Sequence, residues 1–438
     1  MNPEFLTAAE AARAVAEGRL TSVALVTACL ERIDARDPAV RAWLHVDRAG
    51  ALDAAARLDA ERAAGRLRGP LHGVPFGVKD VIDVAGLPCT YNSPLHRDRV
   101  AADDAGCVAV MRAAGGIPLG KTDTVEFAAA GNLPATRNPH DAARTAGGSS
   151  SGSGAAVADL QVPLSFGTQT GGSVIRPAAY CGCYALKPTW GVVSREGAKL
   201  YSATLDTIGW YGRSVADLAL VAGVLDLPPA APRPLAGLRV AVCRTPYADL
   251  ASAAAHAALD AAARAIEAAG AVVVARELPP SMGDLNATKE TVMSGEGRAA
   301  FLPTARVHGD GLNDRLRSHV ENRKGITAAA MCAALDHAAQ SRVAFDSYYR
   351  DVDAVLSLAS SGEADPVAPD HTGSPLLNAL WTLLHVPVVS IPAGDGPAGL
   401  PLAVQLVGFR HADGALLAAA EAVARVVDPW WGEVRVPG

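Results

Sequence analysis

The sequence predicts an α/β protein in which a central β-sheet is covered by helices on both faces. From residue 71 onward, short buried apolar runs alternate with helical segments, which is the pattern of a sheet packed between helices. The chain has 438 residues, 50% of them hydrophobic, and this is enough to bury a large core. Large α/β enzymes of this length often fold as one unit, so we expect residues 1–438 to form a single domain.

Residues 1–65 are predicted to form three helices. Thr7 and Glu10 make a capping box, so a helix begins there. Ser22 caps a second helix, which we expect to end at Pro38 because proline interrupts helical hydrogen bonding. A third, alanine-rich helix follows. The N-terminus lacks the basic and then apolar pattern of a signal peptide, and nothing in this segment points to chemistry.

Residues 70–215 have a different texture and are predicted to hold the catalytic core. Residues 144–154 are almost entirely Gly, Ser and Ala, and a second Gly-rich stretch covers residues 167–176. The elements expected in this part are strands at 73–79, 117–119 and 162–166, a helix at 106–114, and a short helix after residue 154.

Residues 235–438 are expected to continue the same sheet. Four prolines between residues 228 and 234 make a stiff connector to this part. Weak periodicity and many charges predict a peripheral helical insertion near 281–350. The other elements expected here are strands at 238–243, 271–274, 353–358, 386–391 and 402–407, and a helix at 251–269.

Composition and residue spacing limit the binding partners and the cellular location that we expect for this protein. The formal net charge is -6 and no basic stripe is present, so a nucleic acid is not an expected partner. The most apolar window, 376–392, is too short and too polar to span a bilayer. The seven cysteines and eleven histidines lack metal-ligand spacing, so we expect reduced thiols, no metal, no cofactor and a cytoplasmic location.

Lysine usage singles out a candidate base. Only six of the 39 basic residues are lysines, and lysine can lose its proton when buried whereas arginine in practice cannot. Lys79 lies in an apolar run, where desolvation favours the neutral amine. The alternative is a lysine that extends from a strand end to solvent. Lys121 offers the same two interpretations, and for this lysine a structural role is favoured over that of a base.

Two Gly/Ser tracts are candidate site loops. The first, GGSSSGSG (147–154), runs directly into the helix-forming residues 155–158, unlike a flexible linker. In the second, Ser173 follows two glycines, and consecutive glycines let backbone N–H groups converge on one point, as an oxyanion hole requires.

Three segments together resemble the signature blocks of the amidase signature family. They are GVPFGVKD (73–80), GGSSSGSGAA (147–156) and GTQTGGSVIRPAAYCG (167–182), in the family's order, with Ser149 and Ser173 24 positions apart. The resemblance is close over 70–215 and looser beyond. It implies a single amidase-signature domain with a mixed, twisted sheet, and by analogy a homodimer.

The resemblance also implies roles for particular residues. Ser173 matches the nucleophile, Ser149 matches a relay serine preceded by a cis peptide bond, and Lys79 matches the base. Neutral Lys79 would take the Ser173 proton through Ser149 and return it to the departing nitrogen of a small-molecule amide, with an acyl-enzyme between the two steps. The oxyanion hole would be formed by the N–H groups of Thr170, Gly171, Gly172 and Ser173.

The second block departs from the usual family pattern. Most members carry Asp four residues before the nucleophile and Arg two after it, but this chain has Gln169 and Ile175 there, with the arginine at Arg176. This variant resembles the malonamidase subgroup, in which the matching arginine contacts a substrate carboxylate. Arg176 is therefore a candidate for binding a carboxylate-bearing amide such as malonamate. Hydrogen bonding to loop carbonyls is the alternative.

Other functions fit the sequence less well. GSSSG (148–152) matches a nucleophile elbow at Ser150, but no apolar strand precedes it. A glutaminase subunit of a tRNA-dependent amidotransferase is the main alternative, which the changes at Gln169 and Arg176 and the shorter chain oppose. An inactive binding protein is opposed by the complete Lys–Ser–Ser set. Carbamates, anilides and esters remain alternative substrates.

Overall fold

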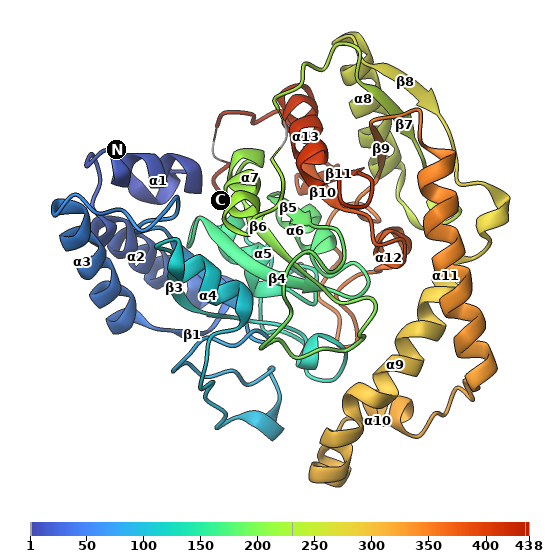
Figure 1. Ribbon diagram of the computed structural model, residues 1–438, viewed down its shortest axis with the longest axis horizontal. Helices are drawn as coiled ribbons and strands as arrows, with labels where there is room; N and C mark the ends of the chain where they lie inside the picture. The colour runs from blue at the N-terminus through green and yellow to red at the C-terminus, as the bar shows by residue number, and fades with distance from the viewer. Residues whose placement is uncertain (1, 230, 434, 438) are drawn as a thin grey trace.

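The computed structural model describes residues 2–229, 231–433 and 435–437, in which eleven strands form one mixed sheet (Figure 1). Parallel pairs join β2 to β3 and β4, and β7 to β8 and β9, and the other neighbours are antiparallel. In sheet order the strands are β1 (Trp43–Val46), β3 (Ile117–Thr122), β2 (Pro75–Lys79), β4 (Leu164–Gln169), β6 (Thr207–Gly212), β5 (Tyr184–Lys187), β10 (Val388–Asp395), β11 (Pro401–Val407), β9 (Ala354–Leu358), β7 (Arg239–Val242) and β8 (Val272–Ala275). The predicted α/β class with a mixed sheet is confirmed.

Helices pack against this sheet in layers (Figure 1). α7 (Val215–Val224), α13 (Asp413–Val427) and α8 (Ala253–Ala268) form one layer, in which α13 contacts both of its neighbours. α5 (Ser151–Ala158) and α6 (Ile175–Cys181) pack on each other and on the central strands. The other helices of the sheet region are α1 (Ala8–Ala16), α2 (Ser22–Val40), α3 (Arg48–Ala63), α4 (Gly106–Ala113) and α12 (Leu376–Leu383).

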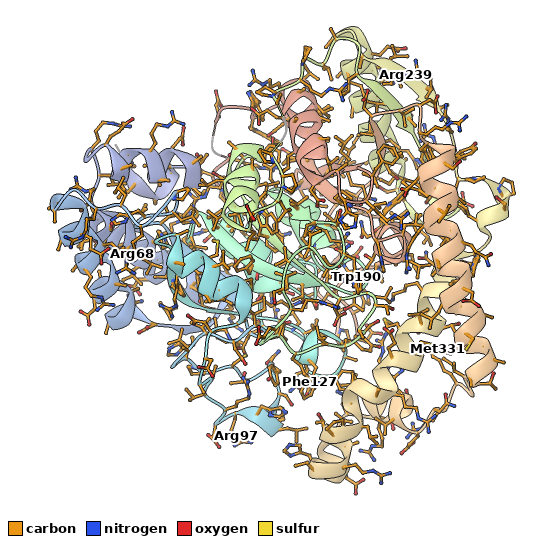
Figure 2. All side chains as sticks on the ribbon, in the orientation of Figure 1. Arg68, Arg97, Phe127, Trp190, Arg239 and Met331 are labelled. Atoms are coloured by element: carbon orange, nitrogen blue, oxygen red, sulfur yellow. The ribbon has the colours of Figure 1, made fainter. Side chains whose placement is uncertain are left out.

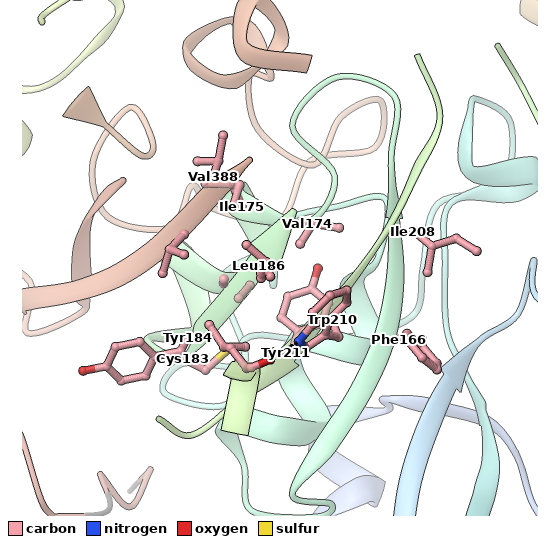
Figure 3. Close-up of a cluster of buried hydrophobic side chains, with 14 of the residues drawn as sticks. Phe166, Val174, Ile175, Cys183, Tyr184, Leu186, Ile208, Trp210, Tyr211 and Val388 are labelled. Atoms are coloured by element: carbon pink, nitrogen blue, oxygen red, sulfur yellow. Dashed lines mark hydrogen bonds between the residues drawn. The ribbon is translucent and has the colours of Figure 1, made fainter. Parts of the chain in front are cut away.

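A buried apolar cluster lies beside the second Gly-rich stretch. Figure 3 shows Phe166 and Trp210 in this cluster together with Val174, which directly follows Ser173. All three side chains are buried. Because close-packed interiors resist small displacements, this packing holds the turn between β4 and α6 in place.

A helical segment lies at one side of the molecule, where the insertion near 281–350 is expected (Figure 1). It consists of α9 (Leu285–His308), α10 (Asp314–Val320) and α11 (Ala328–Tyr348). Phe301 of α9 packs its ring 5.7 Å from Phe127 and 5.4 Å from Tyr201; Figure 2 labels Phe127. These contacts attach α9 to the part of the chain that carries the signature blocks.

The N-terminal segment differs from the prediction in two places. The chain between the second and third helices forms β1, an antiparallel edge strand beside β3. α2 also continues through Pro38 and ends at Val40, with Arg41 (φ 55°) as its C-cap. The capping box at Thr7 is confirmed.

β4 is shifted relative to the prediction, from 162–166 to Leu164–Gln169. Its last residues belong to the Gly-rich stretch and pair with β6. Glycine is depleted in strands, and this composition hid the strand end. An added Cβ at Gly167 would lie 2.8 Å from Ser150 Oγ, so glycine is required by the close approach of the first tract.

The expectations of reduced thiols and of no membrane-spanning segment can be compared with the structure of the described residues. All seven cysteines are free, and six of them are buried while Cys332 is exposed. In the described ranges, no helix has the length and apolar character needed to cross a membrane.

Candidate active site

Lys79 is the last residue of β2, the strand that lies between β3 and β4 in the sheet, and its side chain is wholly buried. Its Nζ lies 2.7 Å from Ser149 Oγ, 2.7 Å from Thr168 Oγ1 and 3.4 Å from the Thr168 carbonyl oxygen. Burial lowers the pKa of Lys79 well below its usual value. Among the described residues, no carboxylate lies within ion-pair distance of this amine. The surroundings therefore favour the neutral form.

Ser149 lies in the loop before α5 and is buried. The peptide bond between Gly148 and Ser149 is cis, as the family resemblance implies. A Cβ added at Gly148 would lie 2.4 Å from Thr372 Oγ1, so a side chain does not fit there. The structure thus brings Lys79 and Ser149 into contact from segments 70 residues apart.

Ser173 lies in the turn between β4 and α6, and lines the same cavity of about 380 Å³ as Ser149. Gln169 Oε1 accepts the N–H groups of Val174 and Ile175, at 2.9 and 3.1 Å, and the Tyr211 hydroxyl donates to the Ser173 carbonyl at 3.3 Å. These bonds hold the turn. No hydrogen bond joins the Ser149 and Ser173 hydroxyls within the described part of the chain.

The glycines of this turn leave their backbone donors available. In the described chain, the N–H groups of Gly171, Gly172 and Ser173 donate no hydrogen bond. A Cβ added at Gly172 would lie 2.5 Å from Asn378 Oδ1, so only glycine fits there. The preceding Thr170 donates its hydroxyl to Asp206 at 2.5 Å. The main-chain donors of Gly171 and Ser173, which line the cavity, are therefore available to a ligand oxygen.

Arg176 of α6 is buried and lines the same cavity. Its Nη2 donates to the Gly148 carbonyl at 2.5 Å and lies 3.4 Å from Thr372 Oγ1. Among the described residues, Nε and Nη1 have no acceptor. Burial lowers the pKa of Arg176. A loop carbonyl is thus one partner, and the rest of the guanidinium is unpaired.

Two further residues singled out in the sequence have structural roles. Lys121 pairs with Asp80 at 3.0 Å in a fully buried ion pair, which confirms its structural interpretation. Ser150 donates to the Thr168 carbonyl and accepts the Thr168 N–H, both at 3.1 Å. A loop precedes Ser150 where a nucleophile elbow would have a strand.

Sequence reasoning did not find three residues of this site. Thr168, the second contact of Lys79, carried no signal inside a Gly-rich block. Asp206 lies behind Thr170, and burial raises the pKa of its carboxyl. Lys289 of α9 lines the cavity, and its only signal was that lysine is rare in this chain. In the described ranges, no group of three His, Cys, Asp or Glu residues is placed to hold a metal ion.

Comparisons with known proteins identify the class of this fold and site. A family model described as Amidase matches residues 24–417. The peptide amidase from Stenotrophomonas maltophilia superposes with a TM-score of 0.84 at 29% identity, over 99% of this chain and 98% of its own. A chain from a vestigial protein complex that reveals the evolutionary origins of an s-triazine catabolic enzyme superposes with a TM-score of 0.86 at 29% identity, over 98% and 100%.

Curated relatives match over nearly their whole length. A glutamyl-tRNA(Gln) amidotransferase subunit of Chloroflexus aggregans is 33% identical over 97% of this chain and 97% of its own. The protein of the same name from Azoarcus sp. is 34% identical over 96% and 97%. The chain therefore belongs to the amidase family, and it is an amide-cleaving hydrolase of the amidase-signature type.

Proposed function

We propose that this enzyme hydrolyses the C–N bond of a small amide through Lys79, Ser149 and Ser173, with an acyl-enzyme on Ser173. The observation that carries this proposal is the buried Lys79 amine, 2.7 Å from Ser149 and without a carboxylate partner in the described chain. A neutral amine has two N–H donors and one lone pair. The donors match the two Thr168 oxygens, and the lone pair matches the Ser149 hydroxyl.

The proton path follows from this arrangement. Once Ser173 turns its hydroxyl toward Ser149, Ser149 passes a proton to Lys79 while accepting that of Ser173. Ser173 Oγ then attacks the carbonyl carbon, and the N–H groups of the turn stabilise the oxyanion. The proton returns along the same chain to the departing nitrogen, which leaves as an amine or ammonia. Water deacylates the enzyme with Lys79 again as the base.

Arg176 points to a carboxylate-bearing substrate such as malonamate, in line with the resemblance to the malonamidase subgroup. Two of its three nitrogens lack acceptors among the described residues, and the residue lines the cavity. Hydrolysis of malonamate and of neutral amides by Arg176→Ala tests this role. We expect malonamate hydrolysis to fall about 30-fold further than that of the neutral amides. Equal losses on both would refute the carboxylate contact.

A second candidate is the glutaminase subunit of a tRNA-dependent amidotransferase. The relatives named as glutamyl-tRNA(Gln) amidotransferase subunits, at 33–34% identity over nearly full length, favour this function more directly than they favour a stand-alone amidase. Glutamine is itself a small amide with a carboxylate. The departures from the usual family pattern at Gln169 and Arg176 oppose the glutaminase function. Co-purification of a second subunit that stimulates glutamine hydrolysis would establish this candidate, and a fully active isolated chain would exclude it.

The central experiment compares Ser173→Ala with Ser150→Ala. We expect a fluorophosphonate to label the wild type and Ser150→Ala but not Ser173→Ala, and amide hydrolysis by Ser173→Ala to fall by about 10⁴-fold or more. The same panel should include esters, carbamates and anilides to define the leaving groups. Full activity of Ser173→Ala would exclude the proposed nucleophile.

A further inference from the structure

A buried lysine other than Lys79 lines the cavity and comes from the helical insertion. Lys289 of α9 is 6% exposed and lines the cavity together with Ser149 and Ser173. A Cβ built on Gly171 would lie 3.7 Å from Lys289 Nζ. The amine therefore lies beside the turn that carries the free backbone donors. Nothing in the proposed proton path uses it.

Within the described chain this amine has no close oxygen partner. Its contacts are Met293 Sδ at 3.0 Å, a weak acceptor, and the Glu290 carboxylate at 3.9 Å. Lys324 already hydrogen-bonds that carboxylate. A buried ammonium without an acceptor is unfavourable, because desolvation is then uncompensated. Lys289 is thus placed to pair with a group that enters the cavity.

The charges around the cavity have one predominant sign. Arg176, Lys289 and Arg315 line it, and among the described lining residues the only carboxylate is that of Asp370, whose side chain is 81% exposed. The buried Asp206 lies behind Thr170, and its oxygens accept from Thr170 and from the N–H groups of Tyr201 and Ser202. The cavity therefore offers cations to an anion, and its described lining offers no buried carboxylate to an ammonium group.

We propose that Lys289 binds an anionic group of the substrate and, with Arg176, makes the enzyme selective for amides that carry a carboxylate and no ammonium. This inference rests on the proposed amide hydrolysis at Ser173 and names its substrate class. The monoamide of a dicarboxylic acid fits these charges. An amino-acid amide such as glutamine would place its ammonium among cations.

The test is a selectivity ratio. Malonamate is compared with isovaleramide, in which an isopropyl group replaces the carboxylate, and kcat/KM is measured for each. We expect wild type to prefer malonamate over isovaleramide and over glutamine by at least about tenfold. In Lys289→Met the malonamate-to-isovaleramide ratio should fall about 30-fold, mainly through KM, because one charge-assisted contact is lost. Lys289→Arg should retain most of it.

Lys199→Met is the matched control, because Lys199 contacts the same helix at the Ala300 carbonyl but does not line the cavity. Its ratio should equal that of wild type. An unchanged ratio in Lys289→Met, or a wild-type preference for glutamine or isovaleramide, would overturn the inference, and the wild-type panel decides this even if the variant does not fold. Amide hydrolysis that persists in Ser173→Ala would instead refute the proposed function.

Discussion

Two buried lysines from different regions lie at the same cavity, Lys289 as a lining residue and Lys79 behind the lining residue Ser149, and their surroundings assign them opposite chemistry. Lys79 ends a central strand and contacts oxygens of Ser149 and Thr168. Lys289 belongs to the peripheral helical insertion and contacts a thioether. Burial lowers the pKa of Lys79 well below its usual value but that of Lys289 only to about 8. Near pH 7 the strand lysine is suited to act as a base, and the helix lysine stays charged and suited to bind an anion.

Among the changes that bear on these two lysines, the largest expected effect comes from removing the capacity of residue 79 to be neutral. Lys79→Arg should lower kcat by about 10³-fold or more, because a guanidinium keeps its proton at any working pH. Lys121→Arg, which keeps the charge of the buried partner of Asp80, is the matched control and should lose far less. Steady-state kinetics on folded protein, verified by circular dichroism, measures this. A Lys79→Arg enzyme with near-normal kcat would show that residue 79 is not the base.

Thr168→Val should have a smaller effect of the same origin. The variant removes the hydroxyl that accepts from the Lys79 amine, so we expect kcat to fall about tenfold from looser positioning of the base. In wild type, kcat/KM should rise with pH as Lys79 loses its proton and then level off. Because the lost acceptor stabilised the charged amine more than the neutral one, the rising limb should move to lower pH in Thr168→Val. A limb that moves to higher pH would contradict this electrostatic account.

The two regions also differ in how far the sequence could predict them. The Gly-rich turn and most of the apolar strands, though not the central β5 and β6, follow from local rules, because short buried strands and consecutive glycines have few other uses. The contact between Lys79 and Ser149 depended on family resemblance, since it joins segments 70 residues apart. Lys289 gave no local signal, because α9 is weakly periodic and its approach to Gly171 depends on Phe301 packing against Phe127 and Tyr201.

The smallest expected effect is a pH dependence of binding that belongs to the helical insertion. Since burial lowers the pKa of Lys289 to about 8, its charge is lost as the pH rises through that value. Glu290 opposes this shift, Arg315 and Lys324 add to it, and Asp206 is a minor opposing charge. We expect KM for malonamate to rise about threefold between pH 7 and pH 9, as a charged contact weakens to a neutral one.

KM for isovaleramide should not follow that rise, because this amide carries no anion for the amine to bind. In Lys289→Arg the rise for malonamate should disappear, since the guanidinium stays charged over this range. The measurement is KM for both amides across the pH range, in wild type and in this variant. If KM for malonamate rises equally in Lys289→Arg, the titrating group is another group of the cavity. Lys289 would then have a structural role, as Lys121 has, and would not bind the substrate anion.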